Sequence, residues 1–284
     1  MRRVMILIGV IVAAFAISPV QANANDGLYL EMDSRSTASY SAGNPTEWND
    51  ISPYARNGVI HGSVSRDIST DALAFDGTSF GTNYVGLPGP FDDFGNGFTM
   101  EFIVEFGADV DGWERIIDFG NGEGSDNIWV GRLGGSQDLA MEIFLGGISQ
   151  GRCHTTSGLL DTRELTDWVV TLDSSLLCHV YREGIEQPTQ RQNRAGSELS
   201  AVSDSGTVYP AFPNVIARTS NFVGRSNWID DHDFEGSIEL IRIHNRPPVD
   251  DNLATTGFDP SQPTALAFLS TGAAVIAIRR RRRI

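Results

Sequence analysis

The chain has 284 residues, of which 36 are Asp or Glu and 21 are Lys or Arg, and its formal net charge is −15. All 21 of these basic positions are arginine. Because a negative chain repels phosphate, this composition excludes nucleic acids and anionic membrane surfaces as main partners. Hydrophobic residues form 40% of the chain, which is enough for a packed core and excludes global disorder.

Residues 1–24 have the three parts of a secretory signal peptide. Arg2 and Arg3 form a basic start, residues 4–17 are apolar, and small residues up to Ala24 occupy the cleavage positions. We therefore expect export, with cleavage after Ala24. The alternative is an uncleaved membrane anchor.

Short bursts of alternating apolar residues fill the region from Leu28 to Ile243, separated by Gly, Asn, Asp and Pro. No window has a 3.6-residue apolar stripe over three turns, so the pattern predicts strands rather than helices. Many strands at regular spacing indicate a two-sheet antiparallel sandwich. In chain order, the predicted strands are Phe98 to Phe106, Arg115 to Phe119, Asn127 to Arg132, Leu139 to Leu145, Trp168 to Leu172, Leu177 to Arg182, Asn221 to Gly224 and Ser237 to Ile243.

Two connections are predicted from their polar residues. Glu183-Gly184 indicates a tight hairpin turn, and the polar stretch from Glu186 to Ser205 indicates a long surface loop. Since no internal repeat occurs, we predict one domain over residues 25–248, followed by a linker and a sorting signal over residues 249–284.

The C-terminal segment runs from an apolar stretch, Thr264 to Ile278, into the arginines at 279–283. As a helix this stretch spans about 22 Å, less than the roughly 30 Å hydrocarbon core of a bilayer. It therefore favours a temporary stop in the membrane, with the arginines inside.

The pentapeptide just upstream, Leu253 to Gly257, reads LATTG. Together with the polar spacer, the apolar run and the arginine tail, it resembles the sorting signal of Gram-positive surface proteins. The resemblance implies that sortase cuts between Thr256 and Gly257 and joins Thr256 to the cell wall. A one-pass membrane anchor and a Pro-Glu-Pro type of C-terminal signal are the alternatives.

Motifs across residues 28–246 follow the order of laminin-G-like, concanavalin-type jelly-roll modules, which this region resembles. The resemblance implies an all-β, concanavalin A-like jelly-roll sandwich of two antiparallel sheets, with an adhesive or carbohydrate-binding role. The chain departs from the family after Tyr181, where Arg182-Glu183-Gly184 stands in place of a common Asn-Gly. The matching motifs are Trp48 to Ser52, Asn57-Gly58, Ala74 to Gly77, Tyr84-Val85, Gly97 to Glu101, Glu114 to Gly120, Cys178 to Tyr181, Val223 to Ser226 and Phe234 to Ile238.

Cys153 and Cys178 are the two cysteines of the chain, and each is followed by a histidine. In an exported protein we expect them to form a disulfide, worth about 3 kcal/mol on the loop-entropy model. A Cys2His2 zinc site with His154 and His179 is one alternative. Neighbouring residues of a strand point to opposite faces, however, which argues against convergence of all four side chains. Free thiols are the other alternative.

A calcium site is predicted where oxygen-bearing side chains alternate with glycines that let backbone carbonyls turn inward. The alternative is a solvated acidic loop, and a second acid cluster lies at residues 230–233. The predicted ligands are Asp118, Asn121, Glu123, Asp126 and Asn127.

Two aromatic side chains, Trp113 and Tyr54, are predicted to be exposed in turns, where each could support a sugar ring. The other tryptophans are expected in the core (Trp129 and Trp168) or at the ends of the sandwich (Trp48 and Trp228).

A glycoside hydrolase of this fold needs two carboxyl groups about 5.5 Å apart on one strand. The nearest pattern, Asp109 to Glu114, contains glycine, falls in a turn and begins with Asp where Glu is usual. We therefore expect no catalysis. The predicted function is a secreted, wall-anchored or alternatively membrane-anchored module that binds a glycan or matrix component, with sortase and the membrane as transient partners. A hydrolase and a structural spacer are the alternatives.

Overall fold

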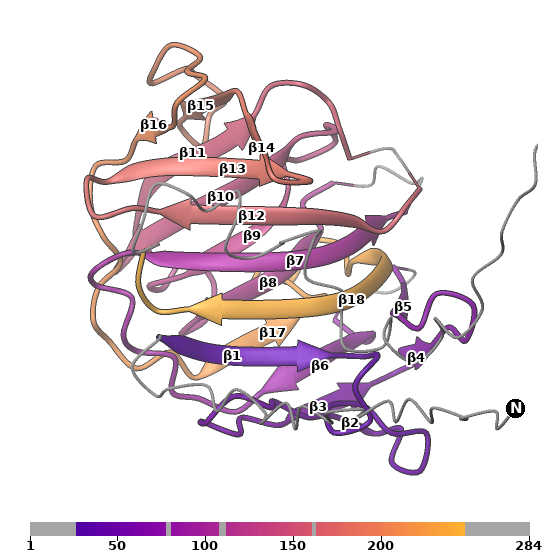
Figure 1. Cartoon of the computed structure of the whole chain (residues 1–284). Coiled ribbons are helices and arrows are strands. Elements are labelled where there is room, and N and C mark those ends of the chain that lie inside the picture. The colour runs from indigo at the N-terminus through magenta and orange to yellow at the C-terminus, as the bar shows by residue number, and fades with distance from the viewer. Residues whose placement is uncertain (1–26, 78–80, 108–111, 161–162, 248–284) are drawn as a thin grey trace, which may run out of the picture.

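The computed structural model describes residues 27–77, 81–107, 112–160 and 163–247. Within these ranges the chain forms two antiparallel sheets of nine strands each, one behind the other (Figure 1). None of these residues belongs to a helix that is long and apolar enough to cross a membrane. The predicted leader with Ala24, and the predicted sorting signal with Thr256 and Gly257, lie outside the described residues and stay predictions.

The first sheet has its two longest strands side by side at the centre (Figure 1). β1 (Leu28–Asp33) pairs with one half of the central strand β18, and β16 (Thr207–Val208) pairs with the start of β13. The main path, in spatial order, is β14 (Ile185–Gln187), β13 (Leu177–Arg182), β12 (Thr166–Leu172), β7 (Phe98–Phe106), β18 (Glu235–His244), β5 (Leu73–Asp76) and β4 (Ser65–Arg66).

The second sheet contains four consecutive strands, β8 to β11, that are also neighbours in space. β17 comes from much later in the chain and pairs with β8 on one side and β6 on the other. In spatial order, the sheet is β15 (Thr189–Gln192), β11 (Ile148–Thr155), β10 (Leu139–Leu145), β9 (Ile128–Arg132), β8 (Arg115–Gly120), β17 (Ser220–Val223), β6 (Tyr84–Leu87), β3 (Gly58–His61) and β2 (Glu47–Trp48).

The main core lies between the sheets and takes side chains from both, among them Phe102 and Trp168 of the first sheet. In the second sheet, Ile128 and Val130 of β9 point into this core, while Trp129 between them belongs to a separate, smaller cluster. This is the period-two alternation of a strand with two covered faces. The predicted all-β, two-sheet sandwich is confirmed.

All eight strands predicted from alternation are present, and β7, β10 and β13 have the predicted bounds. Glu183 and Gly184 have φ values of 50° and 72°, as a type I′ hairpin turn requires, so that prediction is also confirmed. The stretch 186–205 is not a loop throughout, because it contains β15, which pairs with β11. Because its residues are polar, apolar alternation does not predict the edge strand β15.

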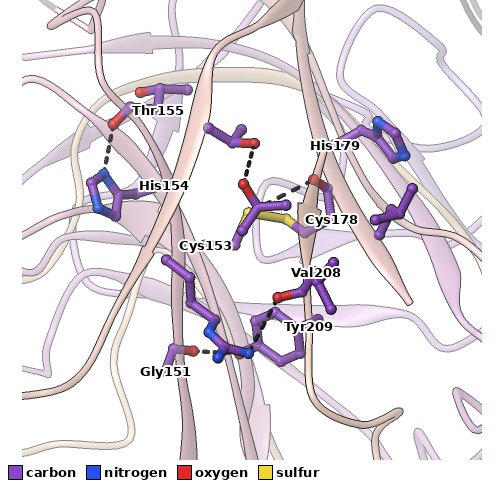
Figure 2. Close-up of a disulfide and its surroundings, with 12 residues drawn as sticks. Gly151, Cys153, His154, Thr155, Cys178, His179, Val208 and Tyr209 are labelled. Carbon is purple, nitrogen blue, oxygen red and sulfur yellow. Dashed lines mark hydrogen bonds between the residues drawn. A yellow bond between two sulfur atoms is a disulfide. The ribbon is translucent and has the colours of Figure 1, made fainter. Parts of the chain in front are cut away.

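A disulfide connects the two sheets through the main core (Figure 2). It joins Cys153 of β11 to Cys178 of β13, with 6.5 Å between the Cα atoms, and both side chains are fully buried. The predicted disulfide is confirmed, and the zinc and free-thiol alternatives are wrong because both sulfurs are bonded. The neighbouring histidines face elsewhere: the Nδ1 atom of His154 lies 2.7 Å from the Thr155 carbonyl oxygen, and that of His179 lies 2.7 Å from Glu186 Oε1.

Candidate ligand-binding site

A row of polar and aromatic side chains crosses the outer face of the second sheet, the face turned away from the first. Strand register aligns Asp118 of β8, Trp129 of β9, Glu142 of β10 and Arg152 of β11. Alternation sends these groups outward because the residues next to them point into the main core. All four are nevertheless buried, none being more than 5% exposed. Loops therefore cover this face.

Those loops enclose a cavity of about 190 Å³ above the row. Trp113 lies two positions before Arg115, the first residue of β8, and Arg194 follows β15. The segment between β17 and β18 contributes two more residues. The side chains that line the cavity are Trp113, Arg115, Glu142, Arg152, Arg194, Trp228 and Asp231.

Arg115 contacts several of the residues that form the wall of the cavity. Its guanidinium carbon lies 3.7 Å from the centroid of the Trp129 ring, 5.6 Å from that of Trp113 and 5.9 Å from that of Trp228. Its Nη1 donates a hydrogen bond to the Trp113 carbonyl oxygen over 2.8 Å, and Nη2 donates to Asp231 Oδ2 over 3.0 Å. Desolvated cation–π contacts are worth about 2 kcal/mol. Arg115 thus fixes both partly exposed indole rings relative to the sheet.

Glu142 and Arg152 form the buried polar floor. Glu142 Oε2 accepts hydrogen bonds from Trp129 Nε1 and Arg152 Nε, both over 3.2 Å, and Oε1 accepts one from the Ser149 hydroxyl. The guanidinium carbon of Arg152 lies 4.2 Å from the Trp113 ring centroid. Trp113 is consequently held by two arginines, one on each of two strands.

Burial governs the electrostatics of this floor. It lowers the pKa of Arg115, an effect that Asp231 and Asp118 oppose. Burial likewise lowers the pKa of Arg152, where Glu142 is the main opposing group. The positive charges are therefore poorly hydrated, and a further anion in the cavity would stabilise them.

Arg194 differs from the other two arginines because it is exposed. Its guanidinium carbon lies 5.4 Å from the Phe144 ring centroid and 5.4 Å from that of Trp228. A second cavity, of about 100 Å³, shares Trp228 and Asp231 with the first. Trp228 and Asp231 therefore border both cavities.

The strands beneath the cavity are fixed from the core side. The Tyr209 hydroxyl accepts a hydrogen bond from the Ile143 backbone N over 2.9 Å and donates one to the Gly151 carbonyl oxygen. Figure 2 shows Tyr209 and Gly151 close to the disulfide. Since Cys153 follows Arg152 directly, the disulfide and Tyr209 together anchor the segment of β11 that presents Arg152.

The residues predicted to bind calcium are occupied with loop contacts. Asp118 Oδ1 accepts a hydrogen bond from Asn127 Nδ2 and Oδ2 accepts one from the Asn227 backbone N, both over 2.8 Å. Burial raises the pKa of Asp118, and the nearby positive charge of Arg115 opposes this shift. Asp118 thus ties the start of the β17–β18 loop to the sheet.

The other predicted calcium ligands make separate contacts. Asn121 Oδ1 accepts a hydrogen bond from the Thr219 backbone N over 3.1 Å, and Asp126 Oδ1 accepts one from Asn214 Nδ2 over 2.7 Å. Glu123 takes part in none of these bonds. In the part of the chain that the structure describes, no three His, Cys, Asp or Glu side chains are grouped to hold a metal. Calcium binding stays a prediction.

The structure separates the two predicted aromatic platforms. Trp113 lines the cavity, whereas Tyr54 is 50% exposed and packs edge-on against Tyr29, 4.9 Å away, with Arg56 4.3 Å above its ring. Tyr54 lines neither cavity. The prediction for Trp228 is wrong: it borders both cavities rather than filling the end of the sandwich.

Trp129 is fully buried as predicted, but on the outer face of the second sheet rather than in the main core. The sequence contains one signal for this outward orientation. Ile128 and Val130 define the inward phase of β9, so a tryptophan between them points to the other face. Trp48 and Trp168, by contrast, both lie in the main core.

Glu114, the last residue of the hydrolase-like pattern, points away from the cavity lining. It forms a buried ion pair with Arg132 and accepts a hydrogen bond from the Glu235 backbone N over 2.9 Å. Burial raises its pKa, and Arg132 opposes the shift. Glu114 therefore connects β9 to the start of β18 through buried contacts. Asp109 lies outside the described residues.

No protein-family model matches the chain, and no curated protein matches its sequence. Solved structures of similar fold include the binding domain of botulinum neurotoxin DC in complex with rat synaptotagmin II. That match has a TM-score of 0.56 and 12% identity over 80% of this chain and 50% of the other. The same domain in complex with SialylT gives 0.54 and 14% over 79% and 49%. The present chain thus spans about half the length of these domains.

A third similar structure is domain 4 of AbnA, an extracellular GH43 arabinanase from Geobacillus stearothermophilus, in complex with arabinotriose. Its TM-score is 0.50, with 15% identity over 78% of this chain and 93% of that domain. At such low identity these matches show a shared fold, the β-sandwich already evident from the strand topology.

Proposed function

We propose that this protein is a non-catalytic binding module that holds a sugar ring of an extracellular glycan between Trp113 and Trp228. The observation that carries the proposal is a cavity with two partly exposed indole walls and a floor of buried charged groups. An aromatic ring can cover the apolar face of a sugar, while a few fixed polar groups bond its hydroxyls.

The size of the cavity fits this role. Its volume of about 190 Å³ is below the roughly 300–1,000 Å³ of pockets that enclose a drug-sized ligand. One sugar ring is a better fit than a larger cofactor. The second cavity, which Trp228 and Asp231 also border, provides room for a neighbouring sugar unit of the same glycan.

Two further observations support a binding role. The sandwich fold is shared with the arabinanase domain whose structure contains arabinotriose, and with a toxin domain named for binding. The predicted leader and sorting signal would also display the module outside the cell, where glycans and matrix components are found. A matrix protein as the ligand is the competing outcome.

A hydrolase is the alternative with a specific observation in its favour, because Glu142 and Asp231 line the same cavity. Each carboxylate, however, is already bonded to protein donors. Glu142 accepts from Arg152 and Trp129, and Asp231 Oδ2 accepts from Arg115 and, over 2.7 Å, from the Ser226 hydroxyl. A general acid would have to give up these contacts. Incubation with a bound glycan should therefore release no shorter sugar.

The test is a glycan array with the full-length chain, followed by titration of the best ligand while tryptophan fluorescence is recorded. Trp113→Ala and Trp228→Ala should each weaken binding by at least about tenfold, as expected for aromatic residues at the centre of a binding site. Tyr54→Ala should leave the affinity unchanged. If Tyr54→Ala removes binding and Trp113→Ala does not, the ligand lies elsewhere and the proposed site is wrong.

A further inference from the structure

Guanidinium groups are concentrated at this one cavity of an otherwise acidic chain. Three arginines and two carboxylates line it, although the chain as a whole has a net charge of −15. A ligand can bond only to those charged groups whose donor or acceptor atoms are not already used within the protein.

The carboxylates have little capacity left. Both oxygens of Glu142 accept hydrogen bonds from protein donors, and Asp231 Oδ2 accepts two. Arg115 donates through Nη1 and Nη2 to Trp113 and Asp231, and its Nε has no partner among the described residues but is buried and out of a ligand's reach. These groups build the walls of the cavity.

The remaining capacity belongs to two arginines. Arg152 donates through Nε to Glu142 and through Nη1 to the Arg194 carbonyl oxygen over 3.5 Å, which leaves Nη2 without a partner among the described residues. Arg152 is only 5% exposed and lines the cavity. The Arg194 guanidinium makes no hydrogen bond within the described part of the chain and lies against the Trp228 and Phe144 rings. The donors available to a ligand are thus cationic.

We propose that the sugar bound here carries a carboxylate group, as uronic and sialic acids do, and that Arg194 and Nη2 of Arg152 bind that group. This inference rests on the proposed function. A guanidinium fork matches the geometry of a carboxylate, and such charge-assisted hydrogen bonds are among the strongest in proteins. The poor hydration of Arg152 strengthens its attraction for an anion.

The net charge of the chain limits the kind of anion. The net negative charge of the chain repels a polyanion such as nucleic acid in proportion to its many charges, whereas a sugar with one acidic group is repelled far less. The tryptophan walls supply the contact for the ring that carries the group. A ligand with both a sugar ring and a carboxylate is an acidic monosaccharide, either at the end of a glycan or inside it.

The decisive experiment measures the affinity of the full-length chain for glycan pairs that differ only in charge: a uronic- or sialic-acid glycan, its methyl ester, and the sulfated counterpart of the neutral sugar. The acidic glycan should bind about tenfold or more tightly than its methyl ester. Arg194→Gln should remove this preference, and Arg194→Lys should restore only part of it because the fork is lost. Since Arg194 is exposed, its replacement does not disturb the core.

Arg66→Gln is the matched control, because it removes one positive charge from β4 in the first sheet, away from the lining of the cavity. It should leave the preference intact. Equal binding of acid and ester, tighter binding of the sulfated sugar, or equal binding of polyglutamate would each overturn the carboxylate inference while the glycan site stands. If no glycan binds and Trp113→Ala changes nothing, the proposed function itself fails.

Discussion

The outer faces of the two sheets use opposite chemistry. On the first sheet, carboxylates dominate: Arg242 pairs with Glu31 over 2.7 Å and with Glu101 over 2.9 Å, and Asp167 and Glu183 lie near them. On the second sheet, three arginines and three tryptophans gather around a cavity. On the first face Arg242, Glu31 and Asp167 are partly exposed. On the second, Arg115, Arg152 and Glu142 are buried and Arg194 is exposed.

This difference supports placing the proposed ligand on the second face. Burying paired charges contributes little to stability, because their desolvation offsets most of their attraction. The buried ion pairs beside the cavity are therefore better explained by a role in ligand binding than by a contribution to stability. The acidic first face repels anions, so an anionic ligand would be directed to the second.

The largest expected effect comes from breaking the buried pair on the second face. Glu142→Leu leaves Arg152 buried without its carboxylate and should lower the free energy of unfolding by about 3–5 kcal/mol. Urea denaturation at constant m-value would measure the loss. The double variant Glu142→Leu/Arg152→Leu should recover most of it, because no unpaired charge remains.

Glu31→Leu provides the comparison on the first face. Arg242 keeps Glu101 as a partner and is partly exposed, so the loss should stay below about 1 kcal/mol. Equal losses for Glu142→Leu and Glu31→Leu would show that the two faces do not differ in how they hold charge.

The second effect concerns the disulfide, which supports the second face from the core side. Its residues are separated by 25 positions, so the Cys153→Ala/Cys178→Ala variant should lose about 3 kcal/mol of unfolding free energy on the loop-entropy model. Ligand affinity should fall as well, because Cys153 adjoins Arg152. Reduction of the wild-type chain should reproduce both changes, and an unchanged urea midpoint after complete reduction would contradict the prediction.

The fold could be predicted from the sequence because alternation reports local geometry. Phe98 to Phe106 reads as a strand from its own residues, and it forms β7 with those bounds. The same dependence on alternation explains why β11 is not predicted. Its outward residues include Arg152 and its inward residues include Gly151 and Cys153, so apolar alternation is weak although the strand is central to the site.

The site was less accessible to sequence reasoning because it depends on contacts between distant segments. Trp113, Arg194 and Trp228 come from three loops, and nothing local indicates that they meet. Asp231 belongs to the acid cluster at residues 230–233, whose sequence does not indicate that Asp231 pairs with Arg115. Among the residues that line the cavity, only Trp113 is predicted from the sequence to contact a ligand, on the turn signal of its glycine neighbour.

The smallest effect tests the first face through pH. Asp167 lies close to Glu101 and Glu183, and burial, followed by these two carboxylates, raises its pKa from 3.8 to about 6. The folded chain therefore binds this proton more tightly than the unfolded chain does. Stability from this group is complete below pH 4 and is lost as the pH rises to about 6. Partial exposure of Asp167 reduces the expected loss to about 1 kcal/mol.

Asp167→Asn should remove this pH dependence, because an amide does not titrate, and should raise the free energy of unfolding at pH 7 by the same amount. Denaturation curves at pH 4.5 and pH 7 would measure both changes. Asp204→Asn removes a carboxylate from an exposed position and should keep the wild-type dependence. If both variants behave like wild type, the acidic first face is fully hydrated, and the contrast between the two faces rests on the buried arginines of the second sheet alone.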